Sequence, residues 1–433
     1  MIRFAIWTAG LLLMLPAVAI TPRGQEHDRR EALRDHAETH RKGFQQTDVP
    51  QFVFPVSGNR FSFSVGGFIN LRGAYVHTNR LQFVEFINLW GAYDMGGMVD
   101  NIDFVTYDIP VPGSYATRQK LTMDASTSRL FVKAIANTRS LGRVVVYIDG
   151  DFRGGAVNSY TPRLRSAYVS FLGLTLGRDV TTFCDLAAAP TTIDFQGPNA
   201  YNFNFATLIR YERSFADDRL SFGVAAEMPA VSGTYGEGFE PIPQRVPDIP
   251  AYIQYAWGPE RSSHLRASVV LRDMYLHNLR TAENTSLLGW GVQLSGTIRC
   301  CRAFRMFMNG VYGKGITPYI QDLTGAGLDF TPDPRNAAYI QTMPMWGWQA
   351  AGQLSLTRRL TLSGGYSTVR IQRSHGFYAD DEYKRGQYIF GNLFYALTPR
   401  CTLAAEYLYG SRRNMSDAEN HANRVNVMLQ YTF

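Results

Sequence analysis

The sequence is poor in charge and has only one long apolar run. Asp, Glu, Lys and Arg make up 18% of the 433 residues. Outside the first 19 residues, no apolar run approaches the ~20 residues that a membrane-spanning helix needs. The chain is therefore not expected to carry a membrane helix after processing.

Catalytic and metal-binding motifs are also missing. The sequence has no G-x-S-x-G, H-E-x-x-H or P-loop pattern. The four cysteines have no histidines at zinc-site spacing, and their pairing stays open. His36 and His40 share one helical face, but no third ligand is fixed nearby, so a solvated face is the better interpretation. We expect no enzyme, no cofactor and no metal.

The N-terminus has the pattern of a secretory signal. Arg3 precedes an apolar stretch from Ile6 to Leu15, and Ala17-Val18-Ala19 forms a small-residue cleavage site. This pattern predicts a signal peptide over residues 1–19 and an exported protein. Export argues against nucleic acid as the partner of a chain whose formal net charge is +7, and favours attraction of small anions.

Residues 20–59 differ from the rest. The stretch from Gln25 to Lys42 is dense in charge and nearly free of apolar side chains, and Arg34–Glu38 and Glu38–Lys42 are spaced as helical ion pairs. We expect a polar periplasmic extension that is a marginal helix or disordered.

From residue 60 onward the sequence alternates with a period of two. In the last stretch, Val425, Val427, Leu429, Tyr431 and Phe433 share one face, and mostly polar residues share the other. This period is typical of β-strands with one apolar and one polar face. In an outer-membrane barrel, the apolar face meets lipid and the polar face lines water.

The connections between the expected strands alternate in length. Short turns occur at 216–218, 357–359 and 397–400, and longer Gly/Pro-rich segments at 230–249, 318–344 and 374–386. Such asymmetry is typical of outer-membrane barrels. A soluble propeller would need a blade repeat, which is absent. The fold prediction is therefore all-β, a transmembrane antiparallel β-barrel of about 16 strands over residues 60–433.

One local duplication complicates the strand count. The stretch Phe68–Tyr75 recurs as Phe86–Tyr93, and both copies alternate. Counting both gives about seventeen strands, but bacterial single-chain barrels have even numbers. We therefore expect one copy to lie in a loop or outside the regular barrel.

Short motifs between residues 91 and 198 resemble a known family. They include Asp94-Met95-Gly96-Gly97-Met98 through Phe104, Ile109-Pro110-Val111-Pro112, Leu176-Gly177-Arg178-Asp179 and Thr192–Pro198. In their order, these motifs resemble the DcaP-like family of trimeric porins. The resemblance implies a sixteen-stranded, homotrimeric outer-membrane porin for passive diffusion of small anionic solutes such as dicarboxylates.

The porin resemblance also implies a loop that folds inward and narrows the pore. Here that loop is residues 181–204, on which Asp185 and Asp194 lie. A strand ending on Phe433 resembles the signal read by the barrel assembly machinery. The implied partners are therefore outer-membrane lipid, this machinery, small anions and two further copies of the chain.

Anion passage requires cations on the inner face, and guanidinium groups bind carboxylates well. Alternation within the strands predicts a set of inward-facing charged residues, in which the carboxylates could pair with the arginines. The predicted pore-lining residues are Arg163, Arg165, Arg210, Arg219, Arg266, Arg272, Asp149 and Asp151.

Two other functions stay open. The barrel could be a structural or adhesive protein without a transport role, whose loops bind a partner. A barrel hydrolase with Ser and His on the outer wall is conceivable, but His264 has no obvious partner set nearby in sequence.

Overall fold

The computed structural model describes residues 30–36, 43, 48–50, 52–56, 60–78, 103–111, 119–156, 159–333 and 335–433. The predicted signal peptide lies outside these ranges. Within them, no helix has the length and apolar character needed to cross a membrane.

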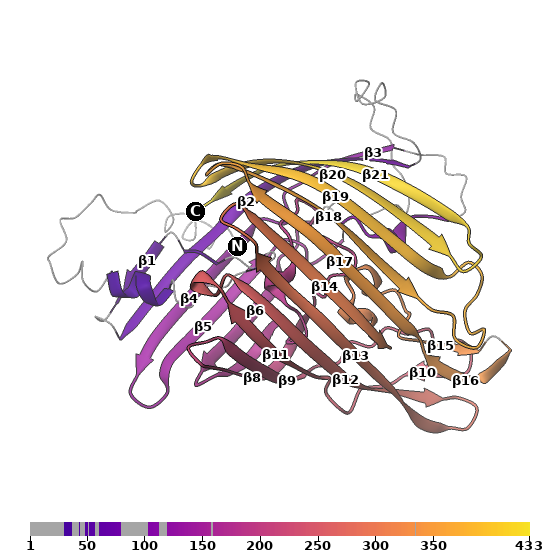
Figure 1. The fold of residues 1–433 in the computed structure, drawn as a ribbon. Helices are drawn as coiled ribbons and strands as arrows, with labels where there is room; N and C mark the ends of the chain where they lie inside the picture. The colour runs from indigo at the N-terminus through magenta and orange to yellow at the C-terminus, as the bar shows by residue number, and fades with distance from the viewer. Residues whose placement is uncertain are drawn as a thin grey trace, which may run out of the picture.

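The described strands close into one antiparallel barrel with sixteen wall positions, which confirms the predicted fold class (Figure 1). Two short strands, β3 and β4, occupy one position and both pair with β2. The last strand, β21, pairs with the opposite edge of β2 and closes the ring. The wall consists of β2 (Phe61–Thr78), β3 (Gln119–Asp124), β4 (Arg129–Thr138), β5 (Gly142–Asp151), β6 (Arg163–Phe171), β7 (Leu174–Val180), β8 (Phe205–Phe215), β9 (Leu220–Glu227), β11 (Ile249–Trp257), β12 (Ser263–Asn278), β13 (Glu283–Arg299), β14 (Phe304–Lys314), β17 (Pro344–Ser355), β18 (Leu360–Ile371), β19 (Tyr383–Thr398), β20 (Cys401–Asn414) and β21 (Glu419–Thr432).

The period of two separates the two faces of the wall as predicted. On β21, Val427, Leu429 and Tyr431 are exposed on the outer surface, and Arg424 and Asn426 are buried inside. Apolar side chains cover the outside because lipid solvates them, and polar side chains gather inside. The wall therefore has the surface of a membrane-spanning barrel.

The lengths of the connections indicate which end of the barrel faces the periplasm. The turns at one end are short, as between β8 and β9 or β17 and β18, and most loops at the other end are long. Short turns lie on the periplasmic side of such barrels. The end of β21 and the short strand β1 (Phe52–Pro55), which pairs with the first residues of β2, lie at this periplasmic end (Figure 1).

The first copy of the duplicated stretch, Phe68–Tyr75, forms the middle of β2. The second copy lies outside the described residues. Three short strands lie in the long loops: β10 (Phe239–Pro241) extends the sheet beside β12, and β15 (Phe330–Asp333) pairs with β16 (Asn336–Thr342).

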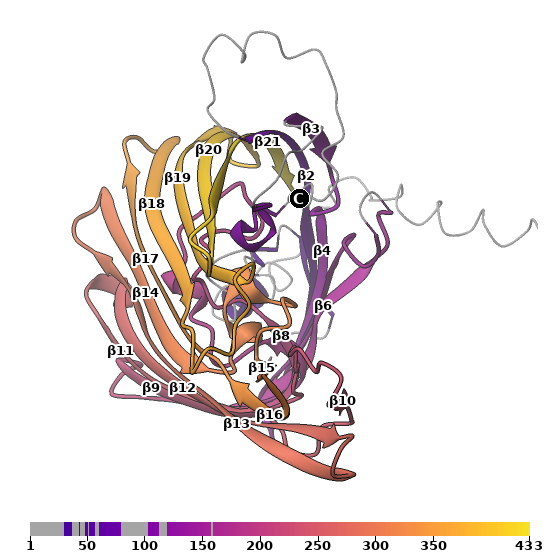
Figure 2. The same cartoon turned by 90° about the vertical axis from the view of Figure 1, so that its right-hand side faces the viewer.

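Three loop segments fold into the barrel, so that its interior is partly filled (Figure 2). They are residues 103–111 with the 3-10 turn η2 (Thr106–Asp108), residues 181–204 with η3 (Leu186–Ala188), and residues 315–330 with η5 (Thr317–Tyr319) and η6 (Gln321–Leu323).

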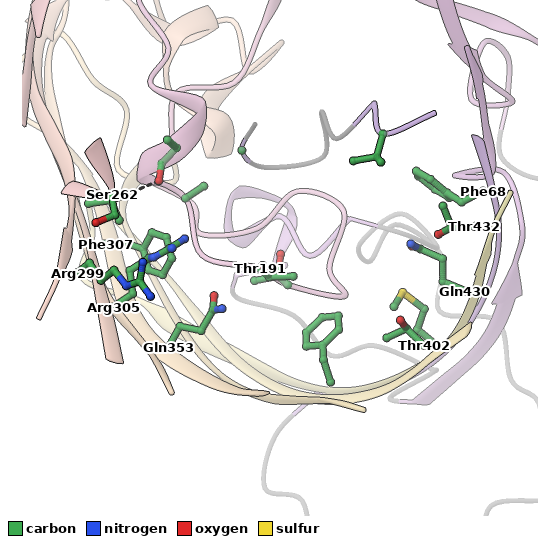
Figure 3. Close-up of a pocket in the computed structure, with 18 of the residues that line it drawn as sticks. Phe68, Thr191, Ser262, Arg299, Arg305, Phe307, Gln353, Thr402, Gln430 and Thr432 are labelled. Carbon is green, nitrogen blue, oxygen red and sulfur yellow. Dashed lines mark hydrogen bonds between the residues drawn. The ribbon is translucent and has the colours of Figure 1, made fainter. Parts of the chain in front are cut away.

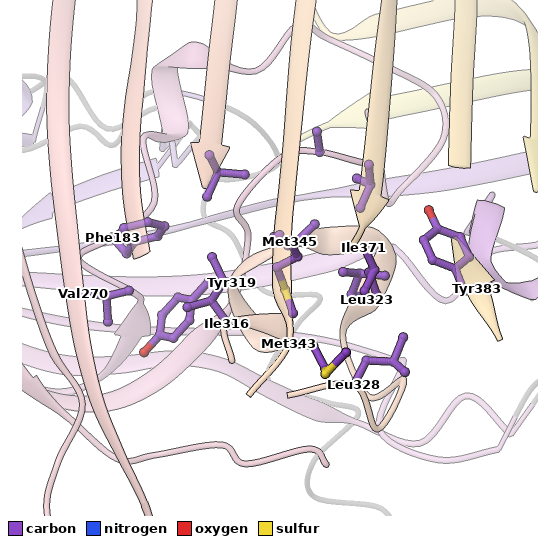
Figure 4. Packing of buried hydrophobic residues seen from close by; sticks show 14 of the residues in the cluster. Phe183, Val270, Ile316, Tyr319, Leu323, Leu328, Met343, Met345, Ile371 and Tyr383 are labelled. Carbon is purple, nitrogen blue, oxygen red and sulfur yellow. The ribbon is translucent and has the colours of Figure 1, made fainter. Parts of the chain in front are cut away.

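Apolar packing holds these segments together. Phe183 of the second segment belongs to one buried apolar cluster with Ile316, Tyr319 and Leu323 of the third segment and Met345 on the wall (Figure 4). Its ring lies edge-on to the ring of Tyr319, with the centroids 5.4 Å apart. Burying such side chains contributes roughly 1.5–3 kcal/mol each. The three inward segments therefore form a packed constriction inside the barrel and not loose loops.

Candidate pore and its lining

The inward segment 181–204 is anchored to the wall by buried carboxylates. Asp185 caps η3 by accepting a hydrogen bond from the Ala187 amide (3.2 Å). The same carboxylate accepts from Ser295 Oγ (2.7 Å) and contacts His264 Nε2 (2.8 Å) on the wall. Burial by itself would raise the pKa of Asp185, but the hydrogen bond and charge of His264 outweigh it and hold the pKa below its ordinary value.

Asp194 anchors a later part of the same segment. It accepts hydrogen bonds from the Phe104 amide (2.9 Å), the Gly197 amide (3.1 Å) and Tyr388 Oη (3.0 Å). Burial raises the pKa of Asp194 to about 7, and the nearby carboxylate of Glu406 adds to the effect. Asp185 therefore anchors the inward segment near its start, and Asp194 anchors it near its middle.

Sequence reasoning missed Glu406 of β20. Its carboxylate accepts from the amides of Ile193 (3.0 Å) and Asp194 (2.7 Å) and so fastens the inward segment to the wall. Its place on the inner face of an alternating strand was the only signal that could have singled it out.

A cavity of about 630 Å³ lies between the inward segment and the periplasmic turns (Figure 3). Thr191 of the segment faces it from the centre, and Gln353 and Phe307 face it from the wall. Arg299 and Arg305 project into it side by side, because they are direct partners in the pairing of β13 and β14.

The charge of this cavity is mostly positive. Its described lining includes four arginines, namely Arg72, Arg261, Arg299 and Arg305, and one carboxylate, Glu260. Arg299 and Arg305 are exposed to the lumen, and among the described residues neither forms an ion pair. Extending the alternation of β13 into the turn at Cys300 would have placed Arg299 inside.

A second cavity of about 410 Å³ contains two of the predicted lining arginines. Arg210 forms ion pairs with Asp179 (2.8 Å) and Glu212 (3.0 Å). Arg266 donates to the Thr182 carbonyl (2.6 Å), and its guanidinium carbon lies 3.5 Å from the centre of the Tyr252 ring. Both side chains face the lumen, and both are already held by protein partners.

Other predicted residues form a charged cluster on the inner wall. Arg165 contacts Asp151 (3.0 Å) and Asp149 (3.5 Å), and Arg163 contacts Asp151 (2.5 Å). Arg129, which sequence reasoning missed, also forms an ion pair with Asp149. The predicted pairing of lumen carboxylates with arginines is therefore present in the geometry.

The remaining two predicted arginines lie away from both cavities. Arg272 is fully buried, with ion pairs to Asp248 and Asp329 at 3.0 Å each. Arg219 is exposed at the periplasmic turn before β9.

Thiols and metal ligands give no further site. The described residues contain no cluster of three or more side chains that could hold a metal ion. All four cysteines are free; Cys184 is buried, and Cys300 and Cys301 are exposed in one turn. Burial raises the pKa of Cys184 to about 12, which makes its thiol unreactive.

A closed sixteen-position barrel with an apolar outer wall and an inward loop over a polar lumen defines the class of outer-membrane channels known as porins. More particularly, the profile of the DcaP outer membrane protein family matches residues 74–295, more than half of the chain. The chain therefore belongs to the DcaP outer membrane protein family, as its motifs indicated, and its place is the outer membrane.

Solved structures share this fold. The outer membrane channel DcaP of Acinetobacter baumannii is 19% identical, with a TM-score of 0.70 over 87% of this chain and 99% of that one. An anion-selective porin from Comamonas acidovorans is 13% identical, with a TM-score of 0.51 over 86% of this chain and all of that one. No curated protein matches the chain in sequence.

Proposed function

We propose that this protein is a passive channel that favours small anions such as dicarboxylates. The observation that carries the proposal is the pair Arg299 and Arg305, which is exposed in the large periplasmic cavity and forms no ion pair within the described residues. The anion-selective porin of similar fold supports the same direction.

The chemistry of the pair suits carboxylates. A solute entering a narrow pore loses water, and guanidinium groups replace those hydrogen bonds in bidentate geometry. Directly paired residues on adjacent strands have side chains roughly 5 Å apart at their base. Arg299 and Arg305 can therefore hold both ends of a short dicarboxylate.

We assign a secondary role to the arginines that already have partners. Arg210 and Arg266 line the second cavity and add positive potential to the path. Arg163, Arg165 and Arg272, each bound to carboxylates, serve as fixed charges of the wall and its loops.

The test is the reversal potential of the channel in a planar bilayer under a salt gradient. Replacing both residues, Arg299→Ala with Arg305→Ala, is expected to shift the reversal potential toward cation preference. Arg358→Ala is the control, because Arg358 is exposed on a periplasmic turn outside both cavities. An unchanged reversal potential in a conducting double variant would contradict the proposal.

The same recordings address the alternative function. A folded barrel that never conducts would favour the structural or adhesive role. A hydrolase would instead show activity lost on changing one serine.

We also propose that the protein is secreted through its N-terminal signal, recognised by the barrel assembly machinery through Phe433, and assembled as a homotrimer. The backbone of Phe433 exchanges two hydrogen bonds with Gly67, so the terminal residue takes part in closing the barrel. Chemical cross-linking in native membranes tests the assembly. For a homotrimer we expect cross-linked bands of two and three copies of the chain and none larger.

A further inference from the structure

Part of the N-terminal extension lies inside the periplasmic mouth of the barrel. Residues 30–36 are helical, and Ala32 and His36 of this helix are buried. His36 hydrogen bonds to Ser62 Oγ (3.2 Å) and Ser64 Oγ (2.9 Å), which belong to the inner face of β2. The helix is therefore docked against the lumen wall and is not simply a solvated extension.

A buried ion pair fixes a second point of the extension. Asp48 contacts Lys133 Nζ at 2.5 Å, and both side chains are fully buried. Lys133 is the direct partner of Ser64 in the pairing of β2 with β4, so it also projects into the lumen. A charge pair removed from water holds its geometry, because separating the partners would leave a buried charge without compensation.

The extension also touches the rim and the inward segment. Asp35 accepts from Asn137 Nδ2 (2.9 Å) and pairs with Arg143 (2.9 Å) beside the short turn between β4 and β5. Gly43 lies so close to the inward segment that a Cβ atom there would fall 2.4 Å from the Leu186 carbonyl oxygen. Contacts thus reach from the wall to the constriction.

These contacts place the extension on the solute path. Gly43 and Val49 line the same 630 Å³ cavity that contains Arg299 and Arg305. That cavity lies on the periplasmic side of the constriction, so a solute leaves it past these residues.

We propose that the extension, through Arg30–His36, Gly43 and Asp48–Pro50, is a built-in plug that narrows the periplasmic mouth of the pore. The lumen surface formed by Ser62, Ser64 and Lys133 is its docking site. The plug limits conductance and solute size, whereas the arginine pair sets the preferred charge, so the two roles are separable.

Single-channel conductance of the full-length protein tests this plug. Asp48→Ala removes the buried pair from the plug side without altering the barrel wall and is expected to raise conductance. Lys133→Ala is expected to act in the same direction. The charge exchange, Asp48→Lys with Lys133→Asp, restores an attractive pair and is expected to return conductance toward the starting value.

The control for the loss of a lysine is Lys384→Ala, which breaks a more exposed Lys–Asp pair, with Asp417, at the opposite end of the barrel. This control is expected to leave conductance unchanged. A deletion variant that lacks residues 24–50 is expected to conduct more than the full chain. Its folding is checked beforehand by heat-modifiable mobility on gels.

The outcomes separate the two proposals. Equal conductance of the full chain and the deletion variant would overturn the plug and leave the anion channel standing. No conductance from either would overturn both. A raised conductance with an unchanged reversal potential would support the plug.

Discussion

Arg272 on β12 is expected to hold the long extracellular loops together. Its guanidinium pairs with Asp248 and Asp329 and donates to the carbonyls of Gly315 (2.6 Å) and Ala230 (2.8 Å). These partners come from the segment before β11 and from the loop between β14 and β17. We expect Arg272→Met to keep the volume of the side chain and leave two buried carboxylates without a cation.

The magnitude follows from the burial. Removing one partner of a buried ion pair costs about 3–5 kcal/mol. If this cost acts on the local opening of the loops, the population of the open state is expected to rise by a factor on the order of 10² to 10⁴, since about 1.4 kcal/mol corresponds to a factor of ten. Proteolysis through a transiently open state follows that population.

Trypsin cleavage of the folded protein in detergent provides the assay. Arg245 and Arg335 lie in the two loops with exposed side chains, and their cleavage is expected to accelerate in Arg272→Met. Cleavage at Arg280, in the short turn between β12 and β13, is the internal control.

A rescue variant sharpens the test. Adding Asp248→Asn and Asp329→Asn to Arg272→Met removes the uncompensated charge and is expected to slow cleavage again. Equal cleavage rates in the parent and in Arg272→Met would refute the reasoning, because the buried pairs would then contribute nothing to loop closure.

Further predictions concern the inward segment. Maleimide is expected to label Cys300 and Cys301 in the folded protein and to spare Cys184, and labelling of Cys184 at a similar rate would contradict its burial. Asp185→Asn is expected to lower stability against urea by roughly 1–3 kcal/mol at pH 8, because its hydrogen-bond partners stay buried. The pKa of Asp185 is lowered by folding, so this contribution is present above the ordinary carboxyl pKa and is lost as the pH falls through the folded value. The pKa of Asp194 is raised to about 7, so its contribution is present at low pH and is lost as the pH rises toward 7. Asp194→Asn is therefore expected to flatten the dependence of stability on pH between about 4 and 7, and a steeper dependence would contradict the assigned direction.

Alternation within strands was enough to predict the barrel and the inward direction of Arg210, Arg266 and Arg272. It could not show which of these charges stay accessible, because that depends on loops far away in sequence. Arg272 is covered by segments that contain Asp248 and Asp329. Such neutralisation arises only when the loops fold into the barrel.

The position of two arginines at strand ends was not predicted, because strand ends are hard to locate from sequence. Arg299 and Arg305 flank the turn at Cys300, where strand ends cannot be fixed within a residue or two from sequence. The docking of the extension was also not predicted, since its charge density is typical of a solvated segment. Its partners, Ser62, Ser64 and Lys133, are ordinary inward-facing residues of β2 and β4.

The two kinds of charge in this barrel differ in their response to ionic strength. Ions screen charges in water over about 8 Å at physiological salt but reach buried pairs much less. The anchors at Asp185, Asp329 and Asp48 are buried, so the dimensions of the passage stay nearly constant from dilute to concentrated medium. The field of Arg299 and Arg305 lies in water and weakens as salt rises. The proposed anion preference is therefore expected to be strongest at low ionic strength and to weaken as salt rises, whereas the size limit set by the buried anchors is expected to stay the same.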